Sequence, residues 1–183
     1  MEEVEEIRLN LGSGDSKFGG FISVDKYDET ADVRADLCEL PYEDNSVAEI
    51  KAYQVIEHIP YNKTEDMFKE MYRVLKPGGT AHLECPDAVW VAKHIVANKG
   101  DFDDIHIKHI FGEYHRPWDI GRYGPQAVEH PGSKHFTMFT FKRLKKIVEP
   151  IGFTVKETKD KHLDVPENLS VILCKPKKSK QVS

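Results

Sequence analysis

The chain has 183 residues, of which 39% are hydrophobic and 31% are charged, and its formal net charge is -5. This balance is typical of a globular protein with one hydrophobic core, and the negative charge disfavours a general role in holding duplex nucleic acid through its phosphates. The acidic first six residues are unlike a signal peptide and no apolar run approaches the length of a membrane span, so we expect one cytoplasmic domain over residues 1–183.

The first predicted strand, residues 7–11, is apolar at Ile7, Leu9 and Leu11 and stops at a glycine turn, Gly12-Ser13-Gly14. A second predicted strand follows at once and ends on an acid, Asp25. Glycines let a ligand approach the backbone closely, and a carboxylate at the tip of the neighbouring strand can accept both hydroxyls of a ribose. The pattern therefore predicts a nucleoside-binding edge.

The connection between these two strands is short. Six residues, 15–20, separate the glycine turn from the second strand, whereas a full parallel crossover needs about a dozen or more. The third glycine position of the dinucleotide fingerprint is Ser16, and no Gly-Lys-Ser/Thr follows the turn, so neither a pyrophosphate-binding helix nor a Walker loop is expected. What remains suits a nucleoside that lacks phosphates and carries an amino acid at its other end, as S-adenosylmethionine does.

Five sequence blocks occur in a fixed order along the chain. They are Leu9-Asn-Leu-Gly-Ser-Gly14, Val24-Asp25, Asp36-Leu37 with Leu40-Pro41, Gln54-Val-Ile-Glu-His58, and Arg73-Val-Leu-Lys-Pro-Gly-Gly79. In this order and at these intervals they resemble the signature blocks of class I S-adenosylmethionine-dependent methyltransferases. Two features depart from many members: Asn10 stands in place of an acid, and the first crossover is short. Both also resemble a compact branch of predicted methyltransferases with little ahead of the first strand.

The resemblance implies an α/β fold of the Rossmann-like kind. It would be a three-layer sandwich with a mostly parallel, seven-stranded type of sheet, a shortened first crossover and a C-terminal antiparallel hairpin. It also implies that S-adenosylmethionine binds outside the carboxyl ends of the strands, as ligands of open parallel sheets do. The residues implied to bind it are Asn10, Gly12, Ser13, Gly14, Asp25, Lys26, Asp36, Leu37, Gln54 and Glu57. Asp36 and its neighbouring amide would contact the adenine, although a turn acid beside a buried leucine is the simpler interpretation.

The remaining elements continue the α/β pattern. Further strands are expected at residues 33–37, around 47–55, and at 80–85, 153–158 and 169–174, the last two as the antiparallel hairpin. Thr64, Asp87 and Thr140 are each placed to cap a helix. The basic segment 175–183 is predicted to be a flexible tail.

Residues 99–139 are long, polar and irregular, with aromatic residues and histidines interspersed. Segments of this length are usually functional or disordered, and the aromatic content disfavours disorder. Because the first strand begins near residue 1, we expect no preceding helix to cover the cofactor, and we expect either this insertion or a second subunit of a homo-oligomer to do so. We expect residues 99–139 to be the substrate-side cover.

The histidines of this insertion raise two hypotheses. They are His106, His109, His115, His130 and His135. Neutral imidazoles bind zinc, but no cysteine lies nearby and the spacings match no standard site, so surface or hydrogen-bonded histidines are favoured and no metal is expected. The second hypothesis is a general base, because a hydroxyl or amine must lose a proton when it is methylated. His58, just past the fourth strand, and His135 are the candidates.

The predicted activity is therefore S-adenosylmethionine-dependent methyl transfer, in the EC 2.1.1 class, to a hydroxyl or amine of a small molecule or sugar. Adenine-amino DNA methyltransferases typically show an Asp/Asn-Pro-Pro-aromatic block after the fourth strand, and cytosine-carbon enzymes show a Pro-Cys nucleophile. This chain has residues 54–58 at the first position and the reversed order Cys85-Pro86, which disfavours nucleic-acid acceptors. Two alternatives stay open: a non-catalytic module that binds S-adenosylmethionine or S-adenosylhomocysteine, and a nucleic-acid-associated protein that uses the aromatic and basic residues.

Overall fold

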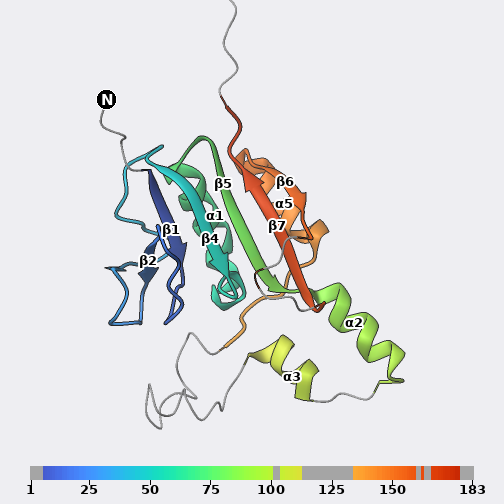
Figure 1. The fold of residues 1–183 in the computed structure, drawn as a ribbon. Coiled ribbons are helices and arrows are strands. Elements are labelled where there is room, and N and C mark those ends of the chain that lie inside the picture. The colour runs from blue at the N-terminus through green and yellow to red at the C-terminus, as the bar shows by residue number, and fades with distance from the viewer. Residues whose placement is uncertain (1–5, 101–103, 113–133, 160–161, 163–165, 178–183) are drawn as a thin grey trace, which may run out of the picture.

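A seven-stranded sheet organises the chain in the computed structural model, which describes residues 6–100, 104–112, 134–159, 162 and 166–177 (Figure 1). The strands are β1 (Ile7–Leu11), β2 (Ile22–Asp25), β3 (Val33–Arg34), β4 (Val47–Tyr53), β5 (Leu75–Pro86), β6 (Thr154–Glu157) and β7 (Asn168–Cys174). Their order is β3-β2-β1-β4-β5-β7-β6; the first five are parallel, and β7 runs antiparallel to both β5 and β6. The mostly parallel sheet and its C-terminal antiparallel hairpin are thus confirmed.

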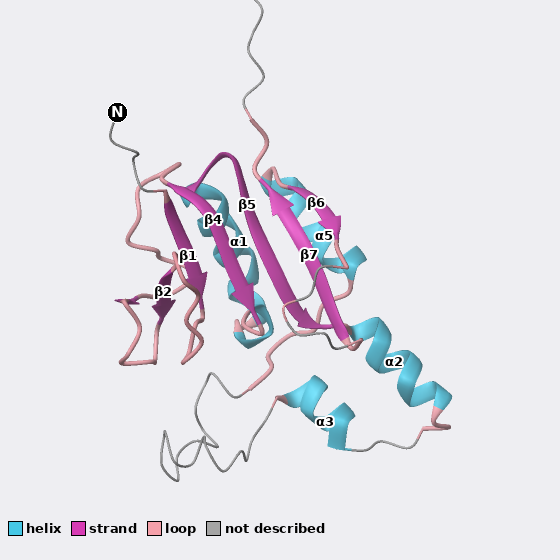
Figure 2. Cartoon of the chain, viewed as in Figure 1, coloured by secondary structure: helices cyan, strands magenta, loops and turns pink. Residues whose placement is uncertain are grey.

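The helices take two positions relative to the sheet. They are α1 (Thr64–Val74), α2 (Ala88–Ala97), α3 (Asp104–Phe111) and α5 (Phe141–Ile151), with short 3-10 turns η1 (Ile56–His58) and η2 (Tyr61–Lys63). Figure 2 shows α1 and α5 behind the sheet on one face, where they contact each other, and α2 and α3 beyond the edge at which the parallel strands end. No helix of the described residues is both long and apolar enough to cross a bilayer.

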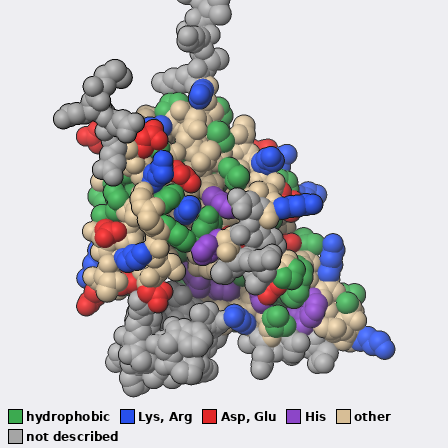
Figure 3. All heavy atoms as spheres, viewed as in Figure 1, with side chains coloured by type: hydrophobic (Ala, Val, Ile, Leu, Met, Phe, Trp, Pro, Cys, Tyr) green, Lys and Arg blue, Asp and Glu red, His purple; other side chains and the backbone are tan. Residues whose placement is uncertain are grey.

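The two faces of the sheet differ in chemistry because side chains alternate along each strand. On the face toward α1, neighbouring residues such as Leu9, Ile50 and Ala81 are fully buried. On the other face, the corresponding positions include Lys51 and His82, and Figure 3, which looks onto it, shows charged side chains and histidines among the hydrophobic ones. Parallel sheets usually have both faces covered by helices. Here, within the described residues, only one face carries them.

Loop residues form the layer on the polar face. The short first crossover places Phe18 edge-on against Tyr53 of β4, with ring centroids 5.8 Å apart, and His162 stacks on Tyr53 at 4.8 Å. The Lys51 ammonium lies over the Phe18 and Phe21 rings at 4.7 and 4.3 Å. Phe18 and Phe21, from the segment between β1 and β2, therefore cover part of this face, which a helix would cover in a longer crossover.

Most local predictions agree with the structure, and three differ. Asp87 and Thr140 cap α2 and α5 as predicted, accepting hydrogen bonds from the second and third residues after them. Thr64 does not cap α1: the cap position is Lys63, and the Thr64 hydroxyl donates to the carbonyl of Pro60 instead. The third strand is shorter than predicted, with only two residues.

The third difference concerns β5 and the basic tail. β5 starts at Leu75 rather than Thr80, because Leu75 pairs with Val47 of β4 and the backbone of Gly78 and Gly79 exchanges hydrogen bonds with Lys175. Lys175, placed by the sequence in a flexible tail, is buried, and its ammonium donates to the side chain of Asn45 at 2.8 Å and the carbonyl of Tyr72 at 2.6 Å. The chain is therefore anchored through residue 175. Residues 178–183 lie outside the described part.

Candidate functional site

The predicted site residues gather along the edge where β1, β2 and β4 end. They form two groups. The glycine-turn half consists of Asn10, Gly12, Ser13, Gly14, Asp25, Lys26, Asp36 and Leu37, from the ends of β1 and β2 and the loop after β3. The histidine half consists of Glu57 and His58 in η1 and His135 in the segment before α5. Gln54, directly after β4, lies between them in the sequence.

The two glycines of the turn have different roles although both have left-handed φ angles, 61° at Gly12 and 47° at Gly14. A Cβ atom on Gly12 would lie 1.6 Å from Cγ2 of Val55, so Gly12 is required because a side chain beyond β4 packs against it. A Cβ atom on Gly14 would meet nothing within 4 Å. The sequence predicted that a ligand approaches the backbone along the whole turn; the structure leaves space for such an approach at Gly14.

Asp25 closes the glycine turn through its carboxylate. Oδ2 accepts a hydrogen bond from the Gly14 amide at 3.0 Å, and Oδ1 accepts from the amides of Tyr27 and Asp28 at 2.7 and 2.9 Å. These bonds fix the carboxylate at the tip of β2. A carboxylate oxygen has two lone pairs, so Oδ2 can still accept a ligand hydroxyl.

Lys26 and Asp36 form an ion pair beside this carboxylate, with 2.8 Å between Nζ and Oδ2. The other Asp36 oxygen accepts from the amide of Cys38 at 2.9 Å. The hydrogen bond from Lys26, then that from Cys38, lowers the pKa of Asp36, so this acid is ionised at neutral pH. Leu37 is buried next to it. Adenine contact and the simpler interpretation of a turn acid are both compatible with this arrangement.

The side chains of Asn10 and Ser13 hold the turn in place through hydrogen bonds to its backbone. Asn10 is 3% exposed, and its side-chain amide donates to the carbonyl of Ser16 at 2.8 Å, which tethers the short crossover to β1. The buried Ser13 hydroxyl donates to the carbonyl of Gly14 at 3.3 Å. An acid in place of Asn10 has no N–H and could not make this contact.

Gln54 has an uncommon backbone conformation at the end of β4. Its φ is 56°, and its amide donates to the carbonyl of Glu84 at 2.7 Å, which continues the sheet for one more residue. Its side-chain Nε2 is buried without a hydrogen-bond partner among the described residues. Left-handed non-glycine residues and unpaired buried polar groups both concentrate at functional sites.

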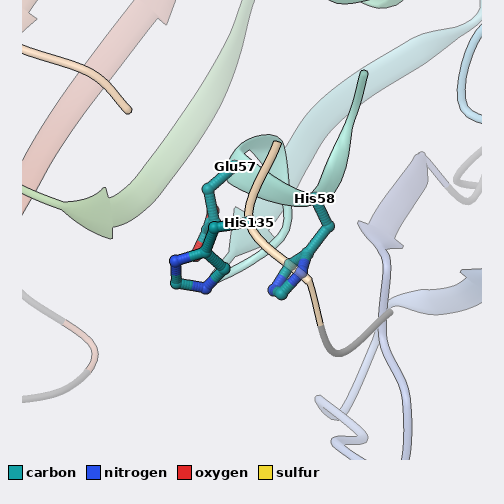
Figure 4. A group of neighbouring side chains, drawn as sticks. All are labelled: Glu57, His58 and His135. Carbon is teal, nitrogen blue, oxygen red and sulfur yellow. The ribbon is translucent and has the colours of Figure 1, made fainter. Parts of the chain in front are cut away.

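The histidine half is assembled by the docking of residues 134–137 onto η1. The amide of Phe136 donates to the carbonyl of Glu57 at 2.8 Å, and Nδ1 of His58 is 2.8 Å from the carbonyl of Lys134. The His58 and His135 rings meet edge to face, with centroids 4.7 Å apart, and both lie beside Glu57 (Figure 4). Two residues 77 positions apart in the sequence, His58 and His135, thus become neighbours.

Glu57 is the most unusual group of the site. It is 1% exposed, and neither carboxylate oxygen has a hydrogen-bond partner from another described residue. Burial raises the pKa of Glu57 to about 8; the charge of Glu84 adds to the rise, and the backbone N–H of Glu57 partly offsets it. Burial, followed by the charges of Glu57 and Asp87, also raises the pKa of the Cys85 thiol. Acidic groups therefore concentrate where β4 and β5 end.

The other histidines of the insertion have hydrogen-bonded roles where the structure describes them. His106 is fully buried, with Nε2 at 2.9 Å from Nδ1 of His94 in α2, and Nδ1 of His109 lies 2.6 Å from the carbonyl of Ile105. This agrees with the interpretation favoured from the sequence. His115 and His130 lie outside the described residues.

The sequence did not predict how His135 is positioned. The carbonyls of His109 and Phe111, in the last turn of α3, hold the Nδ1 and amide of His135 at 2.9 and 3.1 Å. These partners are backbone atoms, so no residue type identified them. The insertion was predicted to be irregular, but it contains α3, whose last turn holds His135 in place.

Comparison with known proteins finds a family model that matches part of the chain. A family model described as a methyltransferase domain matches residues 21–83, from just before β2 into β5. These residues match a class I S-adenosylmethionine-dependent methyltransferase domain. S-adenosylmethionine is the methyl donor of this methyltransferase, and methyl transfer is its activity.

Solved structures share the fold of this methyltransferase over nearly its whole length. A methyltransferase from Methanosarcina mazei is 18% identical with a TM-score of 0.61, over 95% of this chain and 94% of that one. One from Archaeoglobus fulgidus is 14% identical with a TM-score of 0.58, over 93% and 86%. One from Thermotoga maritima is 14% identical with a TM-score of 0.56, over 92% and 82%. At these identities the likeness shows the fold alone, and none of the curated proteins compared with the chain matches it.

Proposed function

We propose that this methyltransferase methylates a hydroxyl or amine of a small molecule or sugar, with the donor at the glycine-turn half and the acceptor at the histidine half. The observation that carries the proposal is the meeting of His58 and His135 at the edge where the parallel strands end. Acceptors of this kind must lose a proton, and imidazole is the side chain that accepts one near neutral pH.

The donor fits the glycine-turn half in polarity and shape. Open space at Gly14 admits a ligand to the backbone, and the fixed Asp25 carboxylate presents Oδ2 to ribose hydroxyls. Asp36 and Leu37 would border the adenine. Gln54, with its unpartnered amide, would face the amino-acid end of the donor. Glu57, which the family resemblance assigned to the donor, lies beside the two histidines.

The chemistry requires positioning and one proton acceptor. A lone pair of the acceptor oxygen or nitrogen forms a bond to the methyl carbon while the carbon–sulfur bond breaks. The electron pair of the breaking bond stays on sulfur, so the sulfonium becomes the neutral thioether of S-adenosylhomocysteine. The proton of the acceptor passes to Nε2 of His58 or His135. In-line displacement depends on holding the nucleophile against the methyl group, which a site with two rigidly held rings supports.

The insertion is proposed to be the substrate-side cover. Its described parts, α3 and residues 134–139, lie against the histidine half: His135 bonds to α3, and Phe139 is fully buried beside Asp87 at the end of β5. Both contacts support a cover that is fixed to the domain on the acceptor side. Residues 113–133 of the same insertion lie outside the described part.

Calorimetry and an acceptor screen test the proposal. Wild-type protein should bind S-adenosylmethionine, and a screen of phenols, sugars and amines that detects S-adenosylhomocysteine should find turnover. His135→Ala should lower turnover roughly 100-fold or more while leaving donor affinity unchanged, because a general base contributes about that much. Folded wild-type protein that binds no donor would contradict the proposal, and so would unchanged turnover in both His58→Ala and His135→Ala.

A further inference from the structure

The histidine half contains three groups of the types that bind transition metals. One ligand atom each from Glu57, His58 and His135 lies within 4.8 Å of the others. We propose that these three residues bind a divalent first-row transition metal ion, with zinc as the reference ion. Metal binding can be tested without any methyl acceptor, and only its role toward the acceptor rests on the proposed function.

The hydrogen bonds of the two imidazoles prepare them to bind a metal. Nδ1 of His58 lies 2.8 Å from the carbonyl of Lys134, and Nδ1 of His135 lies 2.9 Å from the carbonyl of His109. A carbonyl oxygen only accepts, so both Nδ1 atoms carry the proton and both Nε2 atoms carry a lone pair in the neutral rings. Metal-binding histidines almost always have such a partner on the second nitrogen, which fixes tautomer and ring orientation.

The carboxylate of Glu57 supplies the charge. It is 1% exposed, lacks a hydrogen-bond partner from another described residue, and forms no ion pair with a Lys or Arg in the part of the chain that the structure describes. Without a cation, burial keeps this unpaired carboxyl group protonated at neutral pH, as its raised pKa indicates; a bound metal ion would replace the proton and pair with the carboxylate. The charge of Glu84 acts on Glu57, and the charges of Glu84 and Asp87 act on Cys85, so the acids at this end of the sheet favour a cation.

The ligand set indicates which ions would bind. Two imidazoles and one carboxylate form a known catalytic zinc set, and the same combination suits iron(II). In a tetrahedral zinc site with bonds of about 2.1 Å, the ligand atoms lie about 3.4 Å apart. The ligand atoms of Glu57, His58 and His135 lie within 4.8 Å of one another, so side-chain movements of about 1 Å would bring them to that spacing. Three protein ligands leave one coordination position open. With a metal bound, both Nε2 lone pairs would be occupied, so the ion and not an imidazole would favour loss of the proton from an acceptor oxygen held at the open position; the general-base role of the proposed function belongs to the metal-free site.

The other histidine cluster of the described residues lacks these properties. His94 and His106 bond to each other through Nδ1 and Nε2, and Trp90 stacks on His94 with 4.6 Å between centroids. No carboxylate joins them in the described part to form a three-ligand group. The histidine half is thus the site at which a metal should bind first.

Zinc and cobalt titrations test the proposal directly. Full-length protein stripped with EDTA should take up one equivalent of zinc with a dissociation constant below about 1 µM. His58→Ala and His135→Ala should each weaken binding at least about 100-fold, beyond the 10- to 100-fold effect of losing an outer partner. Glu57→Gln should also weaken it about 10-fold or more, and its cobalt complex should show a shifted visible absorption spectrum. His162→Ala, an exposed histidine outside the site, is the matched control and should bind zinc like the wild type.

Two results would overturn the proposal: no zinc uptake by folded wild-type protein at 10-fold excess over about 1 µM, or equal uptake by wild type and the two histidine variants. Circular dichroism of each variant identifies any that fails to fold. If a histidine variant does not fold, Glu57→Gln, which keeps the shape of the side chain, still tests the metal site. Calorimetry with S-adenosylmethionine on the same preparations separates the two hypotheses. Donor binding without zinc binding refutes the metal site alone, and zinc binding without donor binding refutes the proposed function alone.

Discussion

The glycine-turn half and the histidine half are built in opposite ways. The glycine-turn half comes from residues 10–37, and its polar groups are satisfied by neighbours within that stretch, as the three amide bonds to Asp25 show. The histidine half brings together residues near 57, 109 and 135, and it leaves Glu57 without partners from other described residues. In the glycine-turn half, local contacts satisfy the hydrogen bonds of the Asp25 carboxylate without a ligand. In the histidine half, tertiary docking buries a carboxylate whose hydrogen bonds the other described residues do not satisfy.

Val55 joins the two halves, because its side chain fills the space where a Cβ atom on Gly12 would lie. The glycine turn is therefore positioned by the strand that carries the histidine half. Four substitutions test how far the two halves depend on each other, and they follow from the largest expected effect to the smallest.

Gly12→Ala should lower the free energy of unfolding by about 4 kcal/mol, because it adds overpacking against Val55 to a left-handed φ that alanine disfavours. Gly14→Ala, with the same backbone strain and open space, should cost only about 1 kcal/mol. Urea unfolding of both variants measures the difference. In the double variant Gly12→Ala/Val55→Ala the two losses should fall short of additivity by about 2 kcal/mol; full additivity would show that the halves are not joined through this contact.

Asp25→Ala should weaken S-adenosylmethionine binding roughly 100-fold, since it removes charge-assisted hydrogen bonds to the ribose. Zinc binding at the histidine half should stay within about twofold of wild type, because distant independent sites behave additively. Calorimetry with each ligand measures both values. Glu29→Ala, an exposed acid in the loop after β2, is the control, and a loss of donor affinity in that variant equal to the loss in Asp25→Ala would contradict a specific role for Asp25.

Arg73→Met should destabilise the protein by about 2 kcal/mol at pH 7, because the guanidinium holds the carbonyls of Leu40 and Tyr42 and the carboxylate of Glu70. This is less than the sum of the bonds, since the side chain stays 33% exposed. The loop behind Asp36 would loosen, so donor affinity should fall while zinc affinity does not. Lys69→Met, in an exposed ion pair with Glu65, should leave stability unchanged.

The same pair predicts a pH dependence. The hydrogen bond from Arg73 lowers the pKa of Glu70 below its usual 4.5. The stability from this shift is therefore fully present above pH 4.5 and is lost as the pH falls through the lowered pKa in the folded state. The difference in unfolding free energy between wild type and Arg73→Met should shrink below pH 4.5. A difference that grows in acid would contradict this assignment.

Gln54→Gly should raise the free energy of unfolding by about 1 kcal/mol, because glycine adopts a φ of 56° without strain and the unpaired buried amide is removed. Donor affinity should fall about threefold if the amide faces the donor, as a single neutral hydrogen bond would predict. Lys99→Gly is the matched control: it also relieves a left-handed φ, 57°, but lies at the end of α2, so donor affinity should not change. Equal effects on affinity would show that Gln54 stores strain without contacting the donor.

Local chemistry made much of this protein readable from its sequence. Strand periodicity predicted the order of the elements, capping chemistry predicted the starts of α2 and α5, and the glycine turn with Asp25 predicted the nucleoside edge. These features depend on residues a few positions apart, whose backbone preferences and hydrogen bonds act without the rest of the fold. The position of residues 54–58 at the end of β4 follows in the same way.

Only the tertiary structure decided the remaining features. His135 meets His58 because backbone carbonyls of α3 and an amide bond to Glu57 dock residues 134–137, and backbone atoms have no signature in a sequence. Gly12 is required by Val55, a contact across two strands that turn chemistry does not reveal. The sequence alone does not distinguish Glu57 from a glutamate on the surface. Its burial beside His58, His135 and the acid Glu84 near the end of β5 gives it the properties that we assign to a metal ligand.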